Sequence, residues 1–269
     1  MSKIDGRKIA IQIIEELKKK ETSKGILAGI LVGENEAAQS FLKIKKKIAQ
    51  ELGVDFRIYE MPEDISTNKL REEVNRIAQQ GGVKGLIVQL PLPSQLNRER
   101  VLAAIPKEKD VDLLNKKNWR TEGYLRAPAV ETVLEIFKNQ MIKEEEFKNM
   151  KMAIVGFGFL IGEPVGGYFL GKVKKLTVFE EGNNLDELRE YDLVISGVGK
   201  EGVITLKNLK EEAGVIDFGY ERGRGDLEMA LEQELDKLKF WTPTPGGTGP
   251  ILVANLFKNF YKLDKNRKK

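Results

Sequence analysis

Short apolar runs alternate with amphipathic segments along nearly the whole chain. The runs have the length of strands buried on both faces, and the segments between them repeat apolar residues at the helical period. This alternation predicts an α/β protein with parallel sheets. In the first part of the chain we expect strands at residues 26–32, 55–59 and 86–88, and helices at residues 5–19, 36–52, 68–80 and 98–104.

The alternation resumes after a polar, irregular stretch at residues 107–122. Here we expect strands at residues 152–155, 176–179, 193–196 and 215–218, and helices at residues 130–139, 162–170 and 251–261. Two such series predict two α/β domains, with a junction near residues 125–140. We expect the first at residues 1–130 plus 248–269 and the second at residues 131–247, with the C-terminal helix returning to the first domain.

The amino-acid composition excludes several kinds of catalytic and metal sites. The chain has 269 residues, 41% of them hydrophobic, and contains neither cysteine nor histidine. Disulfides, iron–sulfur clusters, thiolate or histidine metal sites, and Ser-His-Asp or Cys-His catalysis are therefore excluded. We expect no metal site, and acid–base work falls to lysine, carboxylates, tyrosine or water.

Charge and hydropathy give no reason to expect a nucleic acid or a membrane as a partner. The formal net charge is +4, from 45 basic and 41 acidic residues, and part of the excess lies in residues 265–269. The longest apolar runs are too short to span a bilayer, and the first five residues do not resemble a signal peptide. We therefore expect a cytoplasmic protein.

A glutamine interrupts the apolar pattern at the end of the strand expected at residues 86–88. Gln89 is followed by Leu-Pro-Leu-Pro at residues 90–93. Proline fixes its own φ and disfavours the helical conformation in the residue before it. An amide at such a position must find hydrogen-bond partners, and open α/β sheets bind ligands beyond the carboxyl ends of their strands. The pattern predicts a site with a rigid wall.

A glycine-rich loop follows the strand expected at residues 152–155. Gly156, Gly158 and Gly162 have the spacing G-x-G-x-x-x-G, one residue longer than the usual dinucleotide fingerprint. Glycines permit a tight turn and let backbone N–H groups approach a pyrophosphate, and the following helix N-terminus favours its negative charge. The alternative is a tight turn that binds no ligand.

Two further segments extend this candidate nucleotide site. Glu180 and Glu181 end the next strand, where a carboxylate would accept hydrogen bonds from an adenosine ribose. A carboxylate there would repel a 2′-phosphate, which favours NAD over NADP, although a surface acidic pair is the alternative. The run Ser196–Gly199 follows another strand with small residues, against which a flat ring could lie.

One lysine of the helix expected at residues 36–52 lies on its apolar face. Lys45 falls within a stripe that we assign to Phe41, Ile44, Ile48 and Leu52, whereas Lys43, Lys46 and Lys47 project from the opposite side. Burial or a nearby cation would lower the pKa of such a lysine and make it usable in proton transfer. The alternative is a side chain that reaches out to solvent.

These segments together resemble the FolD-like family of bifunctional methylenetetrahydrofolate dehydrogenases/methenyltetrahydrofolate cyclohydrolases. The most specific stretches are Gly85–Pro93 and Thr242–Pro250, and the resemblance covers nearly the whole chain. It implies oxidation of 5,10-methylene-tetrahydrofolate to the 5,10-methenyl form with NAD or NADP, followed by hydrolysis to 10-formyl-tetrahydrofolate. It also implies that the N-terminal α/β domain is catalytic, that the second is a Rossmann-like dinucleotide-binding domain, and that the protein is a homodimer.

The resemblance assigns roles to individual residues. Lys45 matches the lysine of the family motif Y-x-x-x-K, Gln89 matches the glutamine beside that lysine, and Asp112 matches an aspartate that holds the pterin ring; these three are the expected catalytic residues. The expected substrate-binding residues are Phe41, Leu90, Pro91, Pro245, Gly246 and Gly247. The expected cofactor-binding residues are Gly156, Phe157, Gly158, Gly162, Pro164, Glu180, Glu181, Ser196, Gly197, Gly199 and Thr248.

The chain departs from the family pattern at several of these positions. The tyrosine of Y-x-x-x-K is Phe41, the usual serine three residues before it is Ala38, and Asp-Val-Asp-Gly ends in Leu113. In the usual G-R-S loop, Phe157 and Gly158 replace arginine and serine, which removes a partner for a 2′-phosphate and again favours NAD. Because phenylalanine has no hydroxyl, we expect the cyclohydrolase activity to be weakened or altered.

Three alternatives stay open on the sequence alone. The first is a dehydrogenase with weak or no cyclohydrolase activity, because Phe41 replaces the tyrosine. The second is a non-catalytic nucleotide-sensing protein of the same fold, which retention of Lys45, Gln89 and Asp112 disfavours. The third is another two-domain dehydrogenase, acting on shikimate or an amino acid, which the two proline-rich stretches disfavour.

Overall fold

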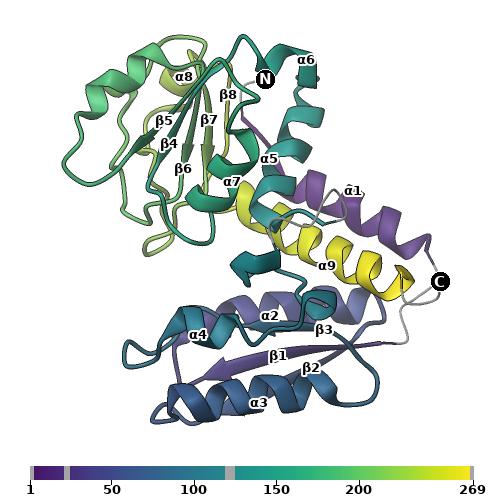
Figure 1. The fold of residues 1–269 in the computed structure, drawn as a ribbon. Helices are drawn as coiled ribbons and strands as arrows, with labels where there is room; N and C mark the ends of the chain where they lie inside the picture. Colours follow the sequence, from purple (N-terminus) through teal and green to yellow (C-terminus); the bar gives the residue numbers. More distant parts are fainter. Residues whose placement is uncertain (1–2, 21–24, 119–124, 267–269) are drawn as a thin grey trace. The chain divides into compact units, whose positions relative to one another are not determined.

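The chain folds into two compact units. The computed structural model describes residues 3–20, 25–118 and 125–266 (Figure 1). One unit, here the first unit, contains Gln12–Pro128 and the chain from Val253 onward. The second unit contains the chain up to Ile11 and Ala129–Leu252. Each unit is built around its own parallel sheet.

A three-stranded parallel sheet in the order β2-β1-β3 forms the centre of the first unit. Every residue of the central strand β1 is buried, as expected for a parallel strand covered on both faces. Figure 1 shows helices α2 and α3 on opposite sides of this sheet. The elements are β1 (Ile26–Val32), β2 (Asp55–Met61), β3 (Val83–Val88), α2 (Glu36–Glu51), α3 (Thr67–Gln79), α4 (Arg98–Leu102) and the part of α1 (Gly6–Lys18) from Gln12 onward.

Polar side chains fix where these helices begin. The Asn35 side chain accepts a hydrogen bond from the Ala38 N–H at 2.9 Å, and Ser66 and Asn97 cap α3 and α4 in the same way. A cap of this kind stabilises a helix by about 1 kcal/mol. The Asn35 cap satisfies a backbone N–H group in the first turn of the helix that carries Lys45.

The C-terminal helix α9 (Thr248–Asn266) contributes its residues from Val253 onward to the first unit. The Asn259 side chain donates a hydrogen bond to the carbonyl oxygen of Val111 at 3.0 Å. A Cβ atom at Gly85 in β3 would lie 2.7 Å from the Phe260 ring, so the glycine gives the helix room against the strand. The expected return of the last helix to the first domain is confirmed.

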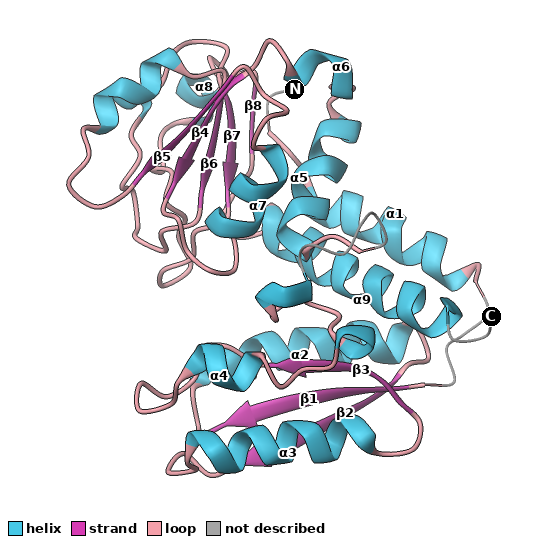
Figure 2. Cartoon of the chain, in the orientation of Figure 1, coloured by secondary structure: helices cyan, strands magenta, loops and turns pink. Residues whose placement is uncertain are grey.

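The second unit holds a five-stranded parallel sheet in the order β5-β4-β6-β7-β8, seen as magenta arrows in Figure 2. The predicted α/β architecture, with a parallel sheet in each part, is confirmed. No helix in the described part of the chain is long and apolar enough to cross a membrane. The elements are β4 (Lys151–Val155), β5 (Lys175–Phe179), β6 (Leu193–Ser196), β7 (Gly214–Asp217), β8 (Phe240–Trp241), α5 (Pro128–Asn139), α6 (Glu144–Phe147), α7 (Gly162–Phe169) and α8 (Glu232–Leu235).

The shortest elements of the fold were not expected from the sequence. They are β8, α6 and α8, which are too short to show a periodic pattern. The stretch expected to be irregular contains two short 3₁₀ turns, Lys107–Lys109 and Lys116–Asn118, and residues 119–122 lie outside the described part.

Strand β8 also bears on the domain limits. The Ile4 N–H donates a hydrogen bond to the Trp241 carbonyl oxygen at 2.8 Å, so the start of the chain pairs with β8. Contacts therefore group the chain up to Ile11 with the second unit, where the sequence placed it with the first. The limits 1–130 plus 248–269 and 131–247 stay a proposal.

Candidate active site

Three polar side chains meet at the carboxyl end of the first sheet. The Lys45 Nζ of α2 donates a hydrogen bond to the Gln89 Oε1 at 3.1 Å, and it lies 4.0 Å from the Asp112 Oδ2. Lys45 and Gln89 are each only 6% exposed. The structure thus brings together the three residues that the sequence singled out as catalytic, from a helix, a strand end and the turn that follows Lys107–Lys109.

The stripe that led to Lys45 is partly wrong. Phe41 and Ile44 are 38% and 45% exposed in the described chain, so they do not line the buried face of α2. Among the side chains of this segment that the structure describes, the buried ones are Ala38, Leu42, Lys45, Ala49 and Leu52. The helix packs on the sheet through Ala38 and Leu42, which cluster with Leu31 of β1. The observed line of buried residues is therefore shifted by one position from the predicted stripe, and Lys45 lies on the observed line.

Burial shifts the proton affinities of the charged pair. Removal from water lowers the pKa of the Lys45 amine, and the nearby Asp112 carboxylate partly opposes this shift. Burial likewise raises the pKa of Asp112, and the charge of Lys45 partly opposes it. Both shifts bring the pKa of Lys45 and the pKa of Asp112 closer together. Lys45 can therefore release and recover a proton closer to neutral pH than a lysine in water can.

The segment after β3 holds the glutamine rigidly. The Gln89 N–H donates to the Ile30 carbonyl oxygen at 2.9 Å, which extends the sheet by one residue. The Gln89 Nε2 donates to the Leu90 carbonyl oxygen at 2.7 Å, so the Oε1 atom is left to face Lys45. The Leu90–Pro91 peptide bond is cis.

A cavity of about 270 Å³ opens beside this segment. Pro91 lines it together with residues from the ends of β1 and β2, as ligand sites in parallel sheets predict. The lining residues are Val32, Gly33, Glu34, Asn35, Glu63, Pro91, Leu92 and Pro93. The prolines predicted to form a wall therefore do border a hollow of the first unit.

In the second unit, the loop from β4 to α7 needs its first and last glycines. Gly156 has φ +83°, and a Cβ atom at Gly162 would lie 2.2 Å from the Gly156 carbonyl oxygen. Gly158 is less constrained, since the nearest described atom to its Cβ position is 4.0 Å away. Pro164 is buried in the first turn of α7, where its fixed φ suits a helix start. The loop and the helix start match what a pyrophosphate requires.

Phe157 and the acidic pair lie at neighbouring strand ends. β4 and β5 run in register, with Val155 opposite Phe179, so the residues after them are at the same level of the sheet. Glu180 and Glu181 are exposed there. The Phe157 ring is 39% exposed and packs on Gly166 of α7, where a Cβ atom would lie 2.8 Å from it. An apolar ring and two carboxylates thus occupy the expected adenosine end.

The run Ser196–Gly199 has a partner that the sequence analysis missed. Ser196 is fully buried, and its hydroxyl donates to the Asp226 Oδ2 at 2.6 Å, so this hydroxyl is already engaged. A Cβ atom at Gly197 would lie 2.9 Å from the Ile161 side chain, and Gly199 has φ +75°. Ligand contact from this run must therefore come from its backbone and from Val198. The only sequence signal for Asp226 is the glycine before it.

The loop at Pro245–Gly247 and the start of α9 belong by their contacts to the second unit. Gly246 has φ +100°, and a Cβ atom at Gly247 would lie 2.5 Å from the Pro243 carbonyl oxygen. Thr248 was expected to bind cofactor, but it is buried and its hydroxyl donates to the Asp217 carbonyl oxygen at 2.8 Å. This bond ties the loop to the end of β7, so the hydroxyl has a structural task.

Comparison with known proteins identifies the family of the chain. Residues 4–112 match the model of the tetrahydrofolate dehydrogenase/cyclohydrolase catalytic domain, and residues 128–268 match that of the NAD(P)-binding domain. The chain belongs to the tetrahydrofolate dehydrogenase/cyclohydrolase family.

Individual relatives agree with the family models over the full length. The chain is 32% identical to the bifunctional protein FolD of Nautilia profundicola over 99% of this chain and 98% of that protein. It is 30% identical to the FolD of a Nitratiruptor species over the whole of both chains. The crystal structure of the bifunctional FolD of Campylobacter jejuni is 30% identical, with a TM-score of 0.90 over 99% of each chain.

These matches confirm the resemblance and the Rossmann-like character of the second domain. They do not support the third alternative, a two-domain dehydrogenase of another family, because both family models match consecutive parts of one chain.

The structure explains one departure from the tetrahydrofolate dehydrogenase/cyclohydrolase pattern. Leu113 stands where Asp-Val-Asp-Gly has its glycine, and it has φ +51° with only 6% exposure. This left-handed conformation costs a non-glycine residue about 1–2 kcal/mol. The backbone thus keeps the shape for which glycine is suited. The shape is needed because Asp110, just before Asp112, accepts the Leu114 N–H at 2.9 Å and closes a tight turn.

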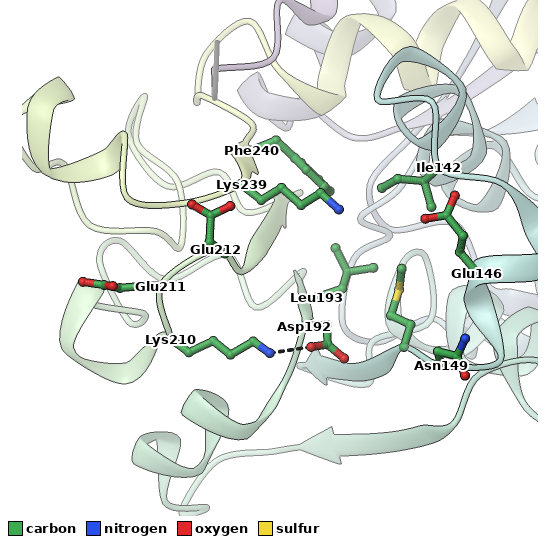
Figure 3. A pocket seen from close by; sticks show the side chains of 11 residues that line it. Ile142, Glu146, Asn149, Asp192, Leu193, Lys210, Glu211, Glu212, Lys239 and Phe240 are labelled. Carbon is green, nitrogen blue, oxygen red and sulfur yellow. Dashed lines mark hydrogen bonds and ion pairs between the residues drawn. The ribbon is translucent and has the colours of Figure 1, made fainter.

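A second hollow in this family member lies away from the predicted site residues. A cavity of about 460 Å³ lies in the second unit, and Asp192 and Lys210, two of the residues that line it, form an ion pair (Figure 3). Asp192 precedes β6 and Lys239 precedes β8, so the cavity lies at the amino ends of the strands. The glycine loops follow the carboxyl ends, where parallel sheets bind ligands. We therefore assign the cofactor to the carboxyl ends, although this hollow is the roomier one.

A buried carboxyl at the end of β7 predicts a pH effect on stability. Burial, with the nearby Asp226 charge, raises the pKa of Asp217 from 3.8 to about 6. Its stabilising contribution is complete below about pH 4 and is lost as the pH rises through 6, a change of about 3 kcal/mol. We expect the free energy of unfolding of the parent, relative to Asp217→Asn, to fall by that amount between pH 4 and 7. Urea unfolding measures it, and a difference that does not vary with pH would contradict the assignment.

Proposed function

We propose that this protein oxidises 5,10-methylene-tetrahydrofolate to 5,10-methenyl-tetrahydrofolate with NAD(P)⁺ and hydrolyses the product to 10-formyl-tetrahydrofolate. The observation that carries the proposal is the buried contact of Lys45 with Gln89 and Asp112 in a chain that belongs to the tetrahydrofolate dehydrogenase/cyclohydrolase family. The same contact speaks against a non-catalytic nucleotide sensor, which would have no need to keep a lysine buried at unfavourable free energy.

The residues of the second unit fit a dinucleotide. Gly156 and Gly162 form a turn that a Cβ atom would block, and α7 begins at the end of that turn. These residues would hold the pyrophosphate, and Glu180 would accept hydrogen bonds from the adenosine ribose. When bound, the nicotinamide accepts the hydride that leaves the methylene carbon of the folate.

The hydrolysis is the task of the Lys45 cluster. Water adds to the methenyl carbon, and the bond from that carbon to N5 breaks. The overall reaction releases one proton. Lys45 in its neutral form takes the proton from the attacking water and can return it to N5, because burial lowers its pKa. Gln89 orients the amine through the Oε1 atom, and Asp112 accepts hydrogen bonds from the pterin ring.

An absorbance assay tests both activities. Methylene-tetrahydrofolate is supplied with NAD or with NADP, and formation of the reduced nucleotide is followed; the decay of methenyl-tetrahydrofolate is followed separately. We expect both reactions to depend on the protein. Absence of reduced nucleotide with either cofactor would overturn the dehydrogenase assignment. Unaccelerated decay would instead leave a dehydrogenase alone, the alternative motivated by Phe41.

We further propose that NAD is the preferred cofactor. Phe157 stands where the family loop usually has an arginine, and Glu180 and Glu181 are exposed at the neighbouring strand end. A 2′-phosphate would lack a cation and face two carboxylates, so we expect kcat/KM for NAD to exceed that for NADP by roughly tenfold or more. In Phe157→Arg, kcat/KM for NADP should rise by about tenfold while that for NAD changes little.

Leu160→Arg provides the matched control for this cofactor test. Leu160 is 48% exposed in the same loop, so the variant adds the same charge at a different place. The gain in NADP use should be clearly smaller than in Phe157→Arg. Equal gains would mean that net charge, and not position 157, decides the preference.

The remaining expectations from the sequence stay proposals. They are the homodimer, the cytoplasmic location and the individual substrate- and cofactor-binding residues. Sedimentation of the purified protein, with and without NAD, would test the dimer.

A further inference from the structure

Asp226 is a buried carboxylate that holds one loop of the second unit from within. It is fully buried and accepts three hydrogen bonds from the last residue of β6 and the loop that follows. Its Oδ2 accepts the Ser196 hydroxyl at 2.6 Å and the Val198 N–H at 2.8 Å, and its Oδ1 accepts the Lys200 N–H at 2.8 Å. Every alternate residue from Ser196 to Lys200 is thus bound to one side chain.

The backbone of Asp226 is itself held in place by hydrogen bonds and close packing. Its carbonyl oxygen accepts the Ile204 N–H at 2.9 Å, within a short parallel pairing of the two segments. Two glycines make room for carboxylates here. A Cβ atom at Gly219 would lie 2.0 Å from the Asp226 Oδ1, and one at Gly225 would lie 2.1 Å from the Asp217 Oδ2. The carboxylate therefore has little freedom to move away from its donors.

The residue at the centre of the held loop also touches the glycine turn. A Cβ atom at Gly156 would lie 3.0 Å from the Val198 side chain and 3.3 Å from its backbone nitrogen, the atom that donates to Asp226. Asp226 thus sets the distance between the run Ser196–Gly199 and the turn at Gly156. A dinucleotide that binds the turn with its pyrophosphate would lay its nicotinamide against this run.

We propose that Asp226 is a positioning residue for hydride transfer: it fixes the Ser196–Gly199 backbone against which the nicotinamide ring lies. The inference rests on the proposed dehydrogenase function. It concerns the nicotinamide end of the cofactor and not the adenosine end, because the three donors are the last residue of β6 and two residues of the loop after it. A misplacement of about 1 Å can lower the rate of a transfer by about 10²-fold.

The variant Asp226→Asn tests this role, because an amide keeps the shape but has only one accepting oxygen. The Ser196 hydroxyl can turn to accept from the new NH₂ group, whereas a backbone N–H of Val198 or Lys200 cannot. We expect kcat for methylene-tetrahydrofolate oxidation to fall by about 10- to 100-fold. We expect the dissociation constant of ADP-ribose, which lacks the nicotinamide, to stay within about twofold, and methenyl-tetrahydrofolate hydrolysis to persist.

Asp192→Asn is the matched control. Asp192 flanks the opposite end of β6, where it accepts the Lys151 N–H at 2.7 Å and pairs with Lys210 (Figure 3). Asp192→Asn removes the same charge next to the amino end of β6, and its kcat for oxidation should stay near the parent value. If Asp226→Asn fails to fold, Ser196→Ala removes one of the three bonds and should lower kcat severalfold with ADP-ribose affinity unchanged.

The outcomes separate the inference from the proposed function. Parent-like kcat in Asp226→Asn, or equal losses of oxidation, hydrolysis and ADP-ribose affinity, would overturn the positioning role. An inactive parent protein would overturn the function itself. In that case the affinity ratio of NADH to ADP-ribose still tests the loop, since Asp226→Asn should lower this ratio and Asp192→Asn should not.

Discussion

Replacement of Lys45 by methionine should lower cyclohydrolase turnover by about 10²- to 10⁴-fold, the usual contribution of a positioned acid–base group. Methionine fills a similar volume but cannot move a proton, and it leaves the Gln89 Oε1 without its donor. Hydride transfer needs no proton from this site, so part of the dehydrogenase activity should persist. The measurement is the protein-dependent decay of methenyl-tetrahydrofolate beside the formation of reduced nucleotide.

Lys46→Met is the control for the Lys45 variant. Lys46 is the next residue of α2 and is exposed, so the variant loses the same charge from the same helix without entering the cluster. Both of its activities should match those of the parent. Parent-level hydrolysis in Lys45→Met would show that Lys45 is not the acid–base group. Equal losses in both variants would point to the charge of the helix and not to the buried amine.

Substitution of Gly162 by alanine should abolish most cofactor use. The added Cβ atom would lie 2.2 Å from the Gly156 carbonyl oxygen and 2.7 Å from the Phe157 Cα, both backbone atoms that cannot move without opening the turn. Because the pyrophosphate would bind this turn, we expect kcat/KM for NAD to fall by about 10²-fold or more. Hydrolysis of methenyl-tetrahydrofolate should continue, since it uses no nucleotide.

Gly167→Ala gives this prediction its control. Gly167 lies in the same helix, and a Cβ atom there would meet no described atom within 4 Å. Alanine in a helix interior is more favourable than glycine by about 0.5–1 kcal/mol, so this variant should be slightly more stable and fully active. If the two variants used NAD equally well, the turn would not be the cofactor site.

Strands and helices that come from a periodic pattern of apolar residues were predictable from the sequence. Every strand except β8, and the longer helices, were expected, because buried parallel strands and amphipathic helices repeat their pattern over several residues. The position of Lys45 on the buried side of α2 was also predictable. The residues that pack beside it were not predictable. Phe41 and Ile44 have the apolar character of core residues, but Ala38 and Leu42 are the ones that pack on the sheet. Apolar character alone does not say which of two adjacent stripes packs.

Features that depend on contacts between distant segments were not predictable. Asp226 lies 30 residues from Ser196 in the sequence, and neither residue is unusual where it stands. Thr248 and Ser196 carry hydroxyls at the expected places, but both hydroxyls are bound to the protein itself. The two-residue strand β8 pairs with β7, and the start of the chain pairs with Trp241 of the same strand. Such partners appear only once the fold has placed them.

The neutrality of Gln89 has a consequence for the whole cluster. Its amide offers Lys45 an oxygen without a negative charge, while the Nε2 group is held by the Leu90 carbonyl oxygen. The cluster therefore contains one cation and one anion, and a proton can leave the lysine against the attraction of a single carboxylate. A glutamate of the same shape would add a second anion and hold the ammonium permanently charged. Because the Gln89 Oε1 accepts a hydrogen bond without adding a negative charge, Lys45 can still lose its proton and act as a base.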